Sequence, residues 1–77
     1  MTSYTALVIQ NNDNDIRCEP YFQDKKTEKW AGAVNLYHGG FFHTTLLSSE
    51  PVFGSSEAAV AYMEDIVKQV RAADVLD

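Results

Sequence analysis

The chain has 77 residues, and its 45% hydrophobic and 22% charged residues are typical of a globular protein and exclude a disordered one. At this length we expect a single domain over residues 1–77, with a core small enough that a partner would add useful stability. Eleven acidic residues against six basic ones give a formal charge of −5, which disfavours nucleic acid and anionic membranes as ligands and favours a basic protein partner.

Cys18 is the only cysteine, so no disulfide can form within the chain and a reducing compartment is expected. The N-terminus lacks the basic stretch and the long apolar run of a signal peptide. No apolar segment approaches the roughly 20 residues that a membrane-spanning helix needs. These observations predict a cytoplasmic protein without a membrane span.

Two β-prone runs near the N-terminus predict a first hairpin. Tyr4 to Gln10 and Ile16 to Phe22 are separated by a polar cluster of asparagine and aspartate residues, which is typical of a turn. A half-buried strand pair must place its apolar residues on a common face. The register that achieves this puts Leu7 and Ile9 on the apolar face, with Cys18 opposite Ile9.

Pro20 lies inside the second of these runs and cannot donate a ladder hydrogen bond. The strand that holds it should therefore be an edge strand or carry a bulge at that position. The following segment, Asp24 to Lys29, is too charged for the core and predicts a loop. An apolar run from Trp30 to Tyr37 then predicts a third strand.

A second hairpin is predicted at Gly39 and Gly40, because both central positions of a type I′ turn require positive φ, which glycine tolerates. The pairs that follow from this turn are His38 with Phe41, Leu36 with His43, and Val34 with Thr45. One face of the sheet then carries Tyr37, Phe42, Ala33 and Leu46. Apolar residues therefore occupy both faces.

The segment from Phe53 to Val75 predicts the only long amphipathic helix. Its apolar residues recur at three- and four-residue steps and so share one face: Ala59, Met63, Ile66, Val67 and Val70. Ser55 or Ser56 is the expected N-cap, because a short hydroxyl side chain accepts a hydrogen bond from a first-turn amide. The acidic residues on the outer side of the helix are Glu57, Glu64 and Asp65.

In chain order, these elements predict an α+β fold with the order β-β-β-β-α. The fold would be a four-stranded antiparallel sheet made of two hairpins, with one C-terminal amphipathic helix packed on one face. One helix covers only one face of such a sheet. The other face carries Tyr37, Phe42 and Leu46, so we expect a partner there, and a homodimer through that face or through the edge strand is predicted.

Three residues are candidates for chemistry. His38 and His43 would share one face of the second hairpin, but two imidazoles are too few for a structural or catalytic zinc site. Cys18 would pair with Ile9 on the apolar face, where a free cysteine behaves as a small hydrophobe and not as an activated nucleophile. We predict no catalytic residue, no metal and no cofactor. A small enzymatic or ligand-binding domain using Cys18, His38 and His43 is the alternative.

The stretch from Leu46 to Val70, LLSSEPVFGSSEAAVAYMEDIVKQV, resembles the end of a YegP-like domain. In that family of small strand-rich units, a strand that ends near a pair of serines leads through a short connection into one amphipathic helix. The resemblance covers about a third of the chain. It implies a strand-to-helix unit and brings no assigned catalytic residues.

Small size, net acidity, 12% aromatic residues and no catalytic constellation together predict a non-enzymatic protein-binding module. We expect an inhibitor or regulator of the type encoded on phages and mobile elements, which occludes a basic, nucleic-acid-handling partner. The residues expected to contact that partner are Tyr37, Phe42, Leu46, Glu50, Glu57, Glu64 and Asp65. A homodimeric structural domain is the second alternative.

Overall fold

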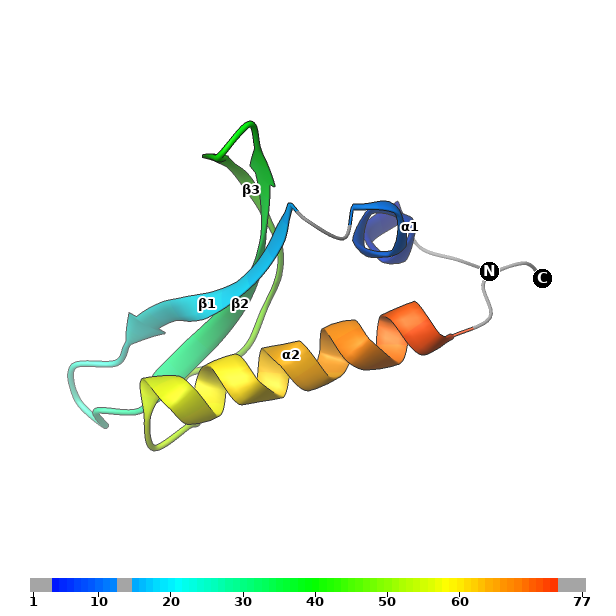
Figure 1. Ribbon diagram of the computed structural model, residues 1–77. Helices are drawn as coiled ribbons and strands as arrows, with labels where there is room; N and C mark the ends of the chain where they lie inside the picture. Colours follow the sequence, from blue (N-terminus) through cyan, green and yellow to red (C-terminus); the bar gives the residue numbers. More distant parts are fainter. Residues whose placement is uncertain (1–3, 13–14, 74–77) are drawn as a thin grey trace.

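The computed structural model describes residues 4–12 and 15–73, and in these ranges the elements follow the order α1-β1-β2-β3-α2 (Figure 1). The three strands are β1 (Ile16–Gln23), β2 (Trp30–His38) and β3 (Phe41–Ser48). They form one antiparallel sheet in the spatial order β1-β2-β3. The fold class is therefore α+β, as predicted, but with a smaller sheet.

The two helices lie on the same side of this sheet. Helix α2 (Ser56–Ala72) runs along one face, packed on β1 and β2. The short helix α1 (Tyr4–Asn11) sits beside the C-terminal end of α2 (Figure 1). None of the helices in the described ranges is long and apolar enough to cross a membrane.

The predicted four-stranded order β-β-β-β-α is wrong at the N-terminal end, because Tyr4–Asn11 is a helix and not a strand. β1 therefore pairs with β2, and Cys18 lies opposite Val34 instead of Ile9. The exposed residues of α1 fall at three- and four-residue steps, which is the period of a helix: Tyr4, Leu7 and Asn11. Two of these three are apolar, so the helical period was hidden in the sequence.

Helix α1 is held in place by one side chain in the core. Ile9 is fully buried and clusters with Val34 of β2 and with Met63 and Val67 of α2. Short isolated helices are marginal in water, and most of their stability in proteins comes from packing. The burial of Ile9 therefore overrides the strand preference of the sequence around it.

Side-chain amides of α1 and of the residue after it donate hydrogen bonds to backbone carbonyls near the C-terminal ends of α1 and α2. The side-chain amides of Asn11 and Asn12 donate to the carbonyl oxygens four residues earlier, each at 2.8 Å. The side-chain amide of Gln10 donates to the carbonyl oxygen of Val70, at 2.6 Å, near the C-terminus of α2. These bonds add side-chain donors near the C-terminal ends of α1 and α2. The asparagines that predicted a turn thus serve as helix-ending residues.

The prediction for Pro20 is confirmed. β1 is an edge strand of the sheet, and its register with β2 shifts between Pro20 and Phe22. The loop that follows is organised by Asp24, whose carboxylate Oδ1 accepts hydrogen bonds from the backbone amides of Lys26 and Thr27 at 2.7 and 3.1 Å. An aspartate in this role builds a turn without proline or glycine.

The β2–β3 hairpin turns at Gly39 and Gly40, whose φ angles are 60° and 85°, and His38 pairs with Phe41 as predicted. Tyr37 still lies opposite Phe42, and two register shifts then displace the pairs beyond it. Leu36 lies opposite Thr44, Val34 opposite Leu47 and Ala33 opposite Ser48. The second shift falls at Leu46, which has no residue of β2 opposite it. Leu46 packs against the core cluster, so its predicted place on the outer face beside Tyr37 and Phe42 is wrong.

The predicted cap at the start of helix α2 is confirmed. Ser55 is the N-cap, and its hydroxyl accepts a hydrogen bond from the Ala58 amide at 3.1 Å. Phe53 lies outside the helix and forms a backbone bridge with Trp30. The predicted apolar stripe is confirmed, since Ala59, Met63 and Val67 are buried and Ile66 and Val70 pack beside them. The predicted helix end at Val75 lies outside the described residues.

Candidate functional site

An apolar groove opens beside α2, on the helix-bearing side of the sheet. Because α2 packs on β1 and β2, it leaves the adjoining side of β3 uncovered. The groove has a volume of about 580 Å³, within the size range of ligand and side-chain pockets. We call it the β3–α2 groove; it is lined by Leu47, Ser48, Ser49, Glu50, Val52, Phe53, Tyr62, Met63 and Ile66.

Large apolar side chains stand at the mouth of the β3–α2 groove. The backbone of Phe53 is fixed by two hydrogen bonds with Trp30, of 2.7 and 3.1 Å, and its ring lies 5.0 Å from the ring of Tyr62. Val52 is 62% exposed and Tyr62 47% exposed. Apolar groups gathered in a concave site, and not scattered singly, are typical of an interaction surface.

The charges around the β3–α2 groove are acidic. Glu50 is part of its lining, and none of the described lining residues is basic. Asp65 lies on the same flank of α2, three residues after Tyr62, where helical side chains are neighbours. The groove is therefore an apolar site with an acidic rim.

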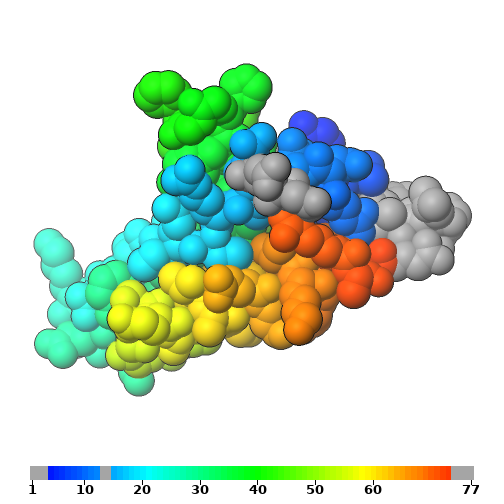
Figure 2. Space-filling view, in the orientation of Figure 1, coloured from blue at the N-terminus to red at the C-terminus, as the bar shows by residue number. Residues whose placement is uncertain are grey.

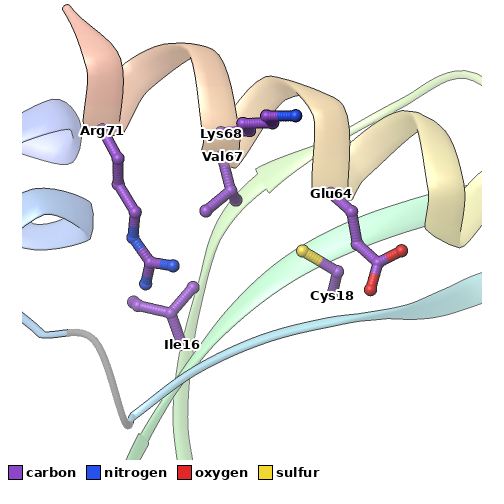
Figure 3. Close-up of a pocket in the computed structure, with 6 residues that line it drawn as sticks. All are labelled: Ile16, Cys18, Glu64, Val67, Lys68 and Arg71. Atoms are coloured by element: carbon purple, nitrogen blue, oxygen red, sulfur yellow. The ribbon is translucent and has the colours of Figure 1, made fainter.

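The opposite flank of α2 is chemically different. A second hollow of about 380 Å³ lies between α2 and β1 and is lined by Ile16, Cys18, Glu64, Val67, Lys68 and Arg71. Figure 3 shows Glu64 and Arg71 extending from α2 toward β1, with the sulfur of Cys18 pointing back at the helix. The basic residues of the second half of α2 thus lie away from the β3–α2 groove.

Cys18 in this hollow is poorly suited to nucleophilic chemistry. Burial raises the pKa of its thiol, and the nearby carboxylate of Glu64 raises it further, outweighing the lowering by Arg71. A cysteine nucleophile needs the opposite, a stabilised thiolate. The side chain is half-buried against the core cluster, as expected for a small packed hydrophobe.

A polar network covers the sheet face that α2 does not touch. The carboxylate of Glu19 accepts hydrogen bonds from the hydroxyl of Tyr37 at 2.7 Å and the side-chain amide of Asn35 at 2.8 Å. Asn35 in turn accepts from the hydroxyl of Thr45 at 2.8 Å, and the guanidinium of Arg17 lies 4.2 Å from the centre of the Tyr37 ring. The polar side chains of this network are therefore hydrogen-bonded within the chain. Phe42 packs edge-on against Tyr37 and is still 58% exposed.

The hydrogen bonds of Glu19 shift the pKa of its carboxyl and of the Tyr37 phenol. The hydrogen bond from Tyr37, and then the one from Asn35, hold the pKa of the Glu19 carboxyl below its ordinary value of 4.5. The same contact with Glu19 raises the pKa of the Tyr37 phenol. Because the folded-state pKa of Glu19 is lowered, the network stabilises the fold above the ordinary pKa of the carboxyl. That stabilisation is lost as the pH falls from about 4.5 through the lowered pKa.

We expect Tyr37→Phe to raise the pKa of Glu19 toward its ordinary value, because the ring stays in place while the main hydrogen-bond donor is removed. The measurement is a pH titration of the Glu19 carboxyl carbon by NMR. Tyr62→Phe is the matched control, since its hydroxyl makes no hydrogen bond to Glu19 in the described ranges. An unchanged Glu19 titration in Tyr37→Phe would contradict the network.

The structure does not bring the seven predicted partner-contact residues to one surface. Tyr37 and Phe42 lie on the outer face of the sheet, and Leu46 packs against the core. Glu50 alone of the seven lines the β3–α2 groove. The three acids on α2 are exposed and spread around the helix: Glu57, Glu64 and Asp65. The prediction missed the apolar groove residues, above all Val52, Phe53, Tyr62 and Ile66.

The candidate chemical residues also lie apart. His38 and His43 are exposed beside the turn of the β2–β3 hairpin, which stands clear of the rest of the molecule in Figure 2. Cys18 pairs with Val34, four residues from His38 along β2, or roughly 13 Å at the rise of a strand. The described residues contain no group of three or more metal-ligating side chains close enough to hold an ion.

Comparison with known proteins adds no relative. No protein-family model, curated protein or solved structure matches the chain. The resemblance of residues 46–70 to YegP-like domains is therefore neither supported nor opposed.

Proposed function

We propose that this domain is a small, acidic, non-enzymatic protein-binding module of the inhibitor or regulator type, acting in the cytoplasm on a basic partner. The observation that supports it best is the β3–α2 groove, an apolar site of about 580 Å³ with exposed Val52 and Tyr62 at its mouth and Glu50 in its wall. Interfaces combine such an apolar centre with a polar rim. The binding surface thus shifts from the outer sheet face to the groove.

The charge distribution supports a basic partner. The chain carries a net charge of −5, and Glu50 lines the groove while Lys68 and Arg71 line the other hollow. A surface of this kind attracts a positively charged protein and increases its rate of association. A nucleic-acid-handling protein is one class that presents such a surface, because it must neutralise phosphates.

The test is affinity capture from the native host with matched surface variants, followed by binding measurements on the purified partner. We expect one specific partner to be recovered by the wild type and by Phe42→Ser on the outer face, but to be lost with the double variant Val52→Ser and Tyr62→Ser. All three side chains are about half exposed or more, so the folds should survive. Binding to the purified partner should weaken as salt is raised.

Two results would overturn this proposal. One is a partner whose recovery depends on Phe42 and not on Val52 and Tyr62. The other is a chain that sediments as a dimer and returns to a monomer on Phe42→Ser. The second result would favour the homodimeric alternative, which the exposed rings of Phe41 and Phe42 support.

A further inference from the structure

The turn of the β2–β3 hairpin carries an aromatic side chain that packs against no other ring of the described residues. We call residues 38–44 the hairpin tip; all of them are exposed, and the tip stands clear of the rest of the molecule in Figure 2. Phe41 in this tip is 79% exposed. Its neighbour Phe42, by contrast, packs edge-on against Tyr37 on the outer face of the sheet. An aromatic side chain on a projecting turn can fill a concave site on another molecule.

Phe41 lies on the same side of the sheet as the β3–α2 groove. Residues of a strand alternate between the two faces, and residues directly opposite on paired strands share a face. Val34 and His38 of β2 are four residues apart and so share a face, which is the α2 face because Val34 belongs to the core cluster. Leu47 lies opposite Val34, and Phe41 lies opposite His38. The tip ring and the groove therefore have the same orientation on the sheet.

The tip and the groove are at opposite ends of one strand. Phe41 is the first residue of β3, and Leu47 in the groove lining is six residues later, at most roughly 20 Å away at the rise of a strand. A two-fold axis near Thr44, in the middle of β3, exchanges the two ends and brings each tip to the groove of a second copy. The residues of β3 without a partner in β2, His43 and Leu46, interrupt regular pairing between two such edges. The contact is therefore one of side chains.

The hairpin tip also suits a groove that has an acid in its wall. Glu50 lines the groove, and residues 30–49 contain no aspartate, glutamate, lysine or arginine. The tip can therefore approach Glu50 without the like-charge repulsion that opposes contact between two acidic chains. The β1–β2 loop, residues 24–29, has no large apolar side chain to fill the groove, and the exposed side of α2 carries acids. The hairpin tip is both apolar and free of carboxylates.

We propose that the chain forms a two-fold dimer in which Phe41 of each copy inserts into the β3–α2 groove of the other. Its ring enters among Leu47, Tyr62 and Met63, where ring–ring and sulfur–ring contacts are favourable. Each groove is thus completed by a residue of the second copy. The inference goes beyond the proposed function, because it adds a state in which the groove is covered and a partner has to displace Phe41.

The test is sedimentation of the full chain at concentrations up to about 1 mM. We expect a dimer that Phe41→Ser, the tip variant, weakens by about tenfold or more. The double change Val52→Ser and Tyr62→Ser, the groove variant, should weaken it similarly. Phe42→Ser is the matched control, since it removes the neighbouring ring from the opposite face and should leave the dimer intact. All four side chains are about half exposed or more, so the variants should fold.

A mixture of the two weakened chains shows whether the tip and the groove contact each other. The tip variant keeps its groove and the groove variant keeps its tip, so a mixed dimer retains one of the two contacts. In the tip variant labelled with ¹⁵N, addition of the unlabelled groove variant should shift the NMR signals of the Leu47, Ser48 and Ile66 amides. Addition of the unlabelled tip variant should not shift them.

A monomer at about 1 mM would overturn the inference, and so would a dimer that depends on Phe42 and not on Phe41. A mixture that leaves the groove amides unshifted would also overturn it. The proposed function is tested separately. If the dimer fails while capture of the host partner still depends on Val52 and Tyr62, the inference falls and the proposed function stands. If the dimer forms as described but capture does not depend on these two residues, the proposed function falls and the inference stands.

Discussion

Replacing Gly32 with alanine is expected to destabilise the domain by about 1–3 kcal/mol, because the added methyl group has no room. Gly32 lies in β2 beneath α2, where a Cβ would be 2.7 Å from the carbonyl oxygen of Ala59 and 2.7 Å from Cγ of Met63. The Met63 side chain can turn aside, but the Ala59 oxygen belongs to the helix backbone. Thermal unfolding should show a midpoint lowered by about 4–8 °C for each kcal/mol.

Gly54→Ala is the control for this experiment. Gly54 lies just before the N-cap Ser55, has no atom within 4 Å of an added Cβ, and does not have the positive φ that favours glycine. Its replacement should be neutral, or should stabilise the fold by about 0.4–1 kcal/mol through the unfolded chain. Equal unfolding midpoints for the two variants would show that α2 does not approach β2 as closely as the structure has it.

The elements that could be predicted from the sequence are those whose cause is local. The serine cap and apolar stripe of α2 and the Gly39–Gly40 turn each follow from a few neighbouring residues, and each is present in the structure. Pro20 likewise predicted an edge strand or a bulge from its missing amide alone, and the structure has both. In these cases local preference and the tertiary fold agree.

The elements that could not be predicted depend on contacts between distant segments. α1 is helical because Ile9 is buried against Val34 and Met63, far along the chain, while its own β-branched residues favour a strand. The second register shift of β3 directs Leu46 toward the core, and a turn at Gly39 and Gly40 carries no information about it. A bulge of this kind changes the face of the sheet on which a residue lies. Leu46 therefore packs against the core and not on the predicted outer face.

The candidate site was missed for a related reason. The β3–α2 groove exists because α2 lies over β1 and β2 and leaves β3 uncovered, and the lateral position of a helix on a sheet is not encoded in its own periodicity. The acid at Glu50 was identified from the charge pattern, which is local. Phe53 and Tyr62 were not, because their pairing depends on the bridge between Phe53 and Trp30.

Ile9→Ala is expected to cost about 2–5 kcal/mol, which approaches the total stability of so short a domain. Ile9 is the only residue of α1 that is fully buried, and the cavity left by its truncation would open between α1 and the Met63 side of the core. Alanine has a higher helix propensity than isoleucine, so the substitution should slightly favour helix formation. A loss of stability would therefore come from lost packing and not from a weaker helix. Urea unfolding followed by circular dichroism gives the change in the free energy of unfolding.

Leu7→Ala is the matched control, and the pair distinguishes helix α1 from the predicted N-terminal hairpin. In the structure Leu7 is 43% exposed on the outer stripe of α1, so its truncation should cost only about 0.5–1 kcal/mol. In the hairpin, Leu7 and Ile9 would lie on the same apolar face two residues apart, and both truncations would create cavities of similar cost. Similar losses for the two variants would therefore restore the hairpin, whereas a loss confined to Ile9 requires a segment whose side chains alternate at the helical period.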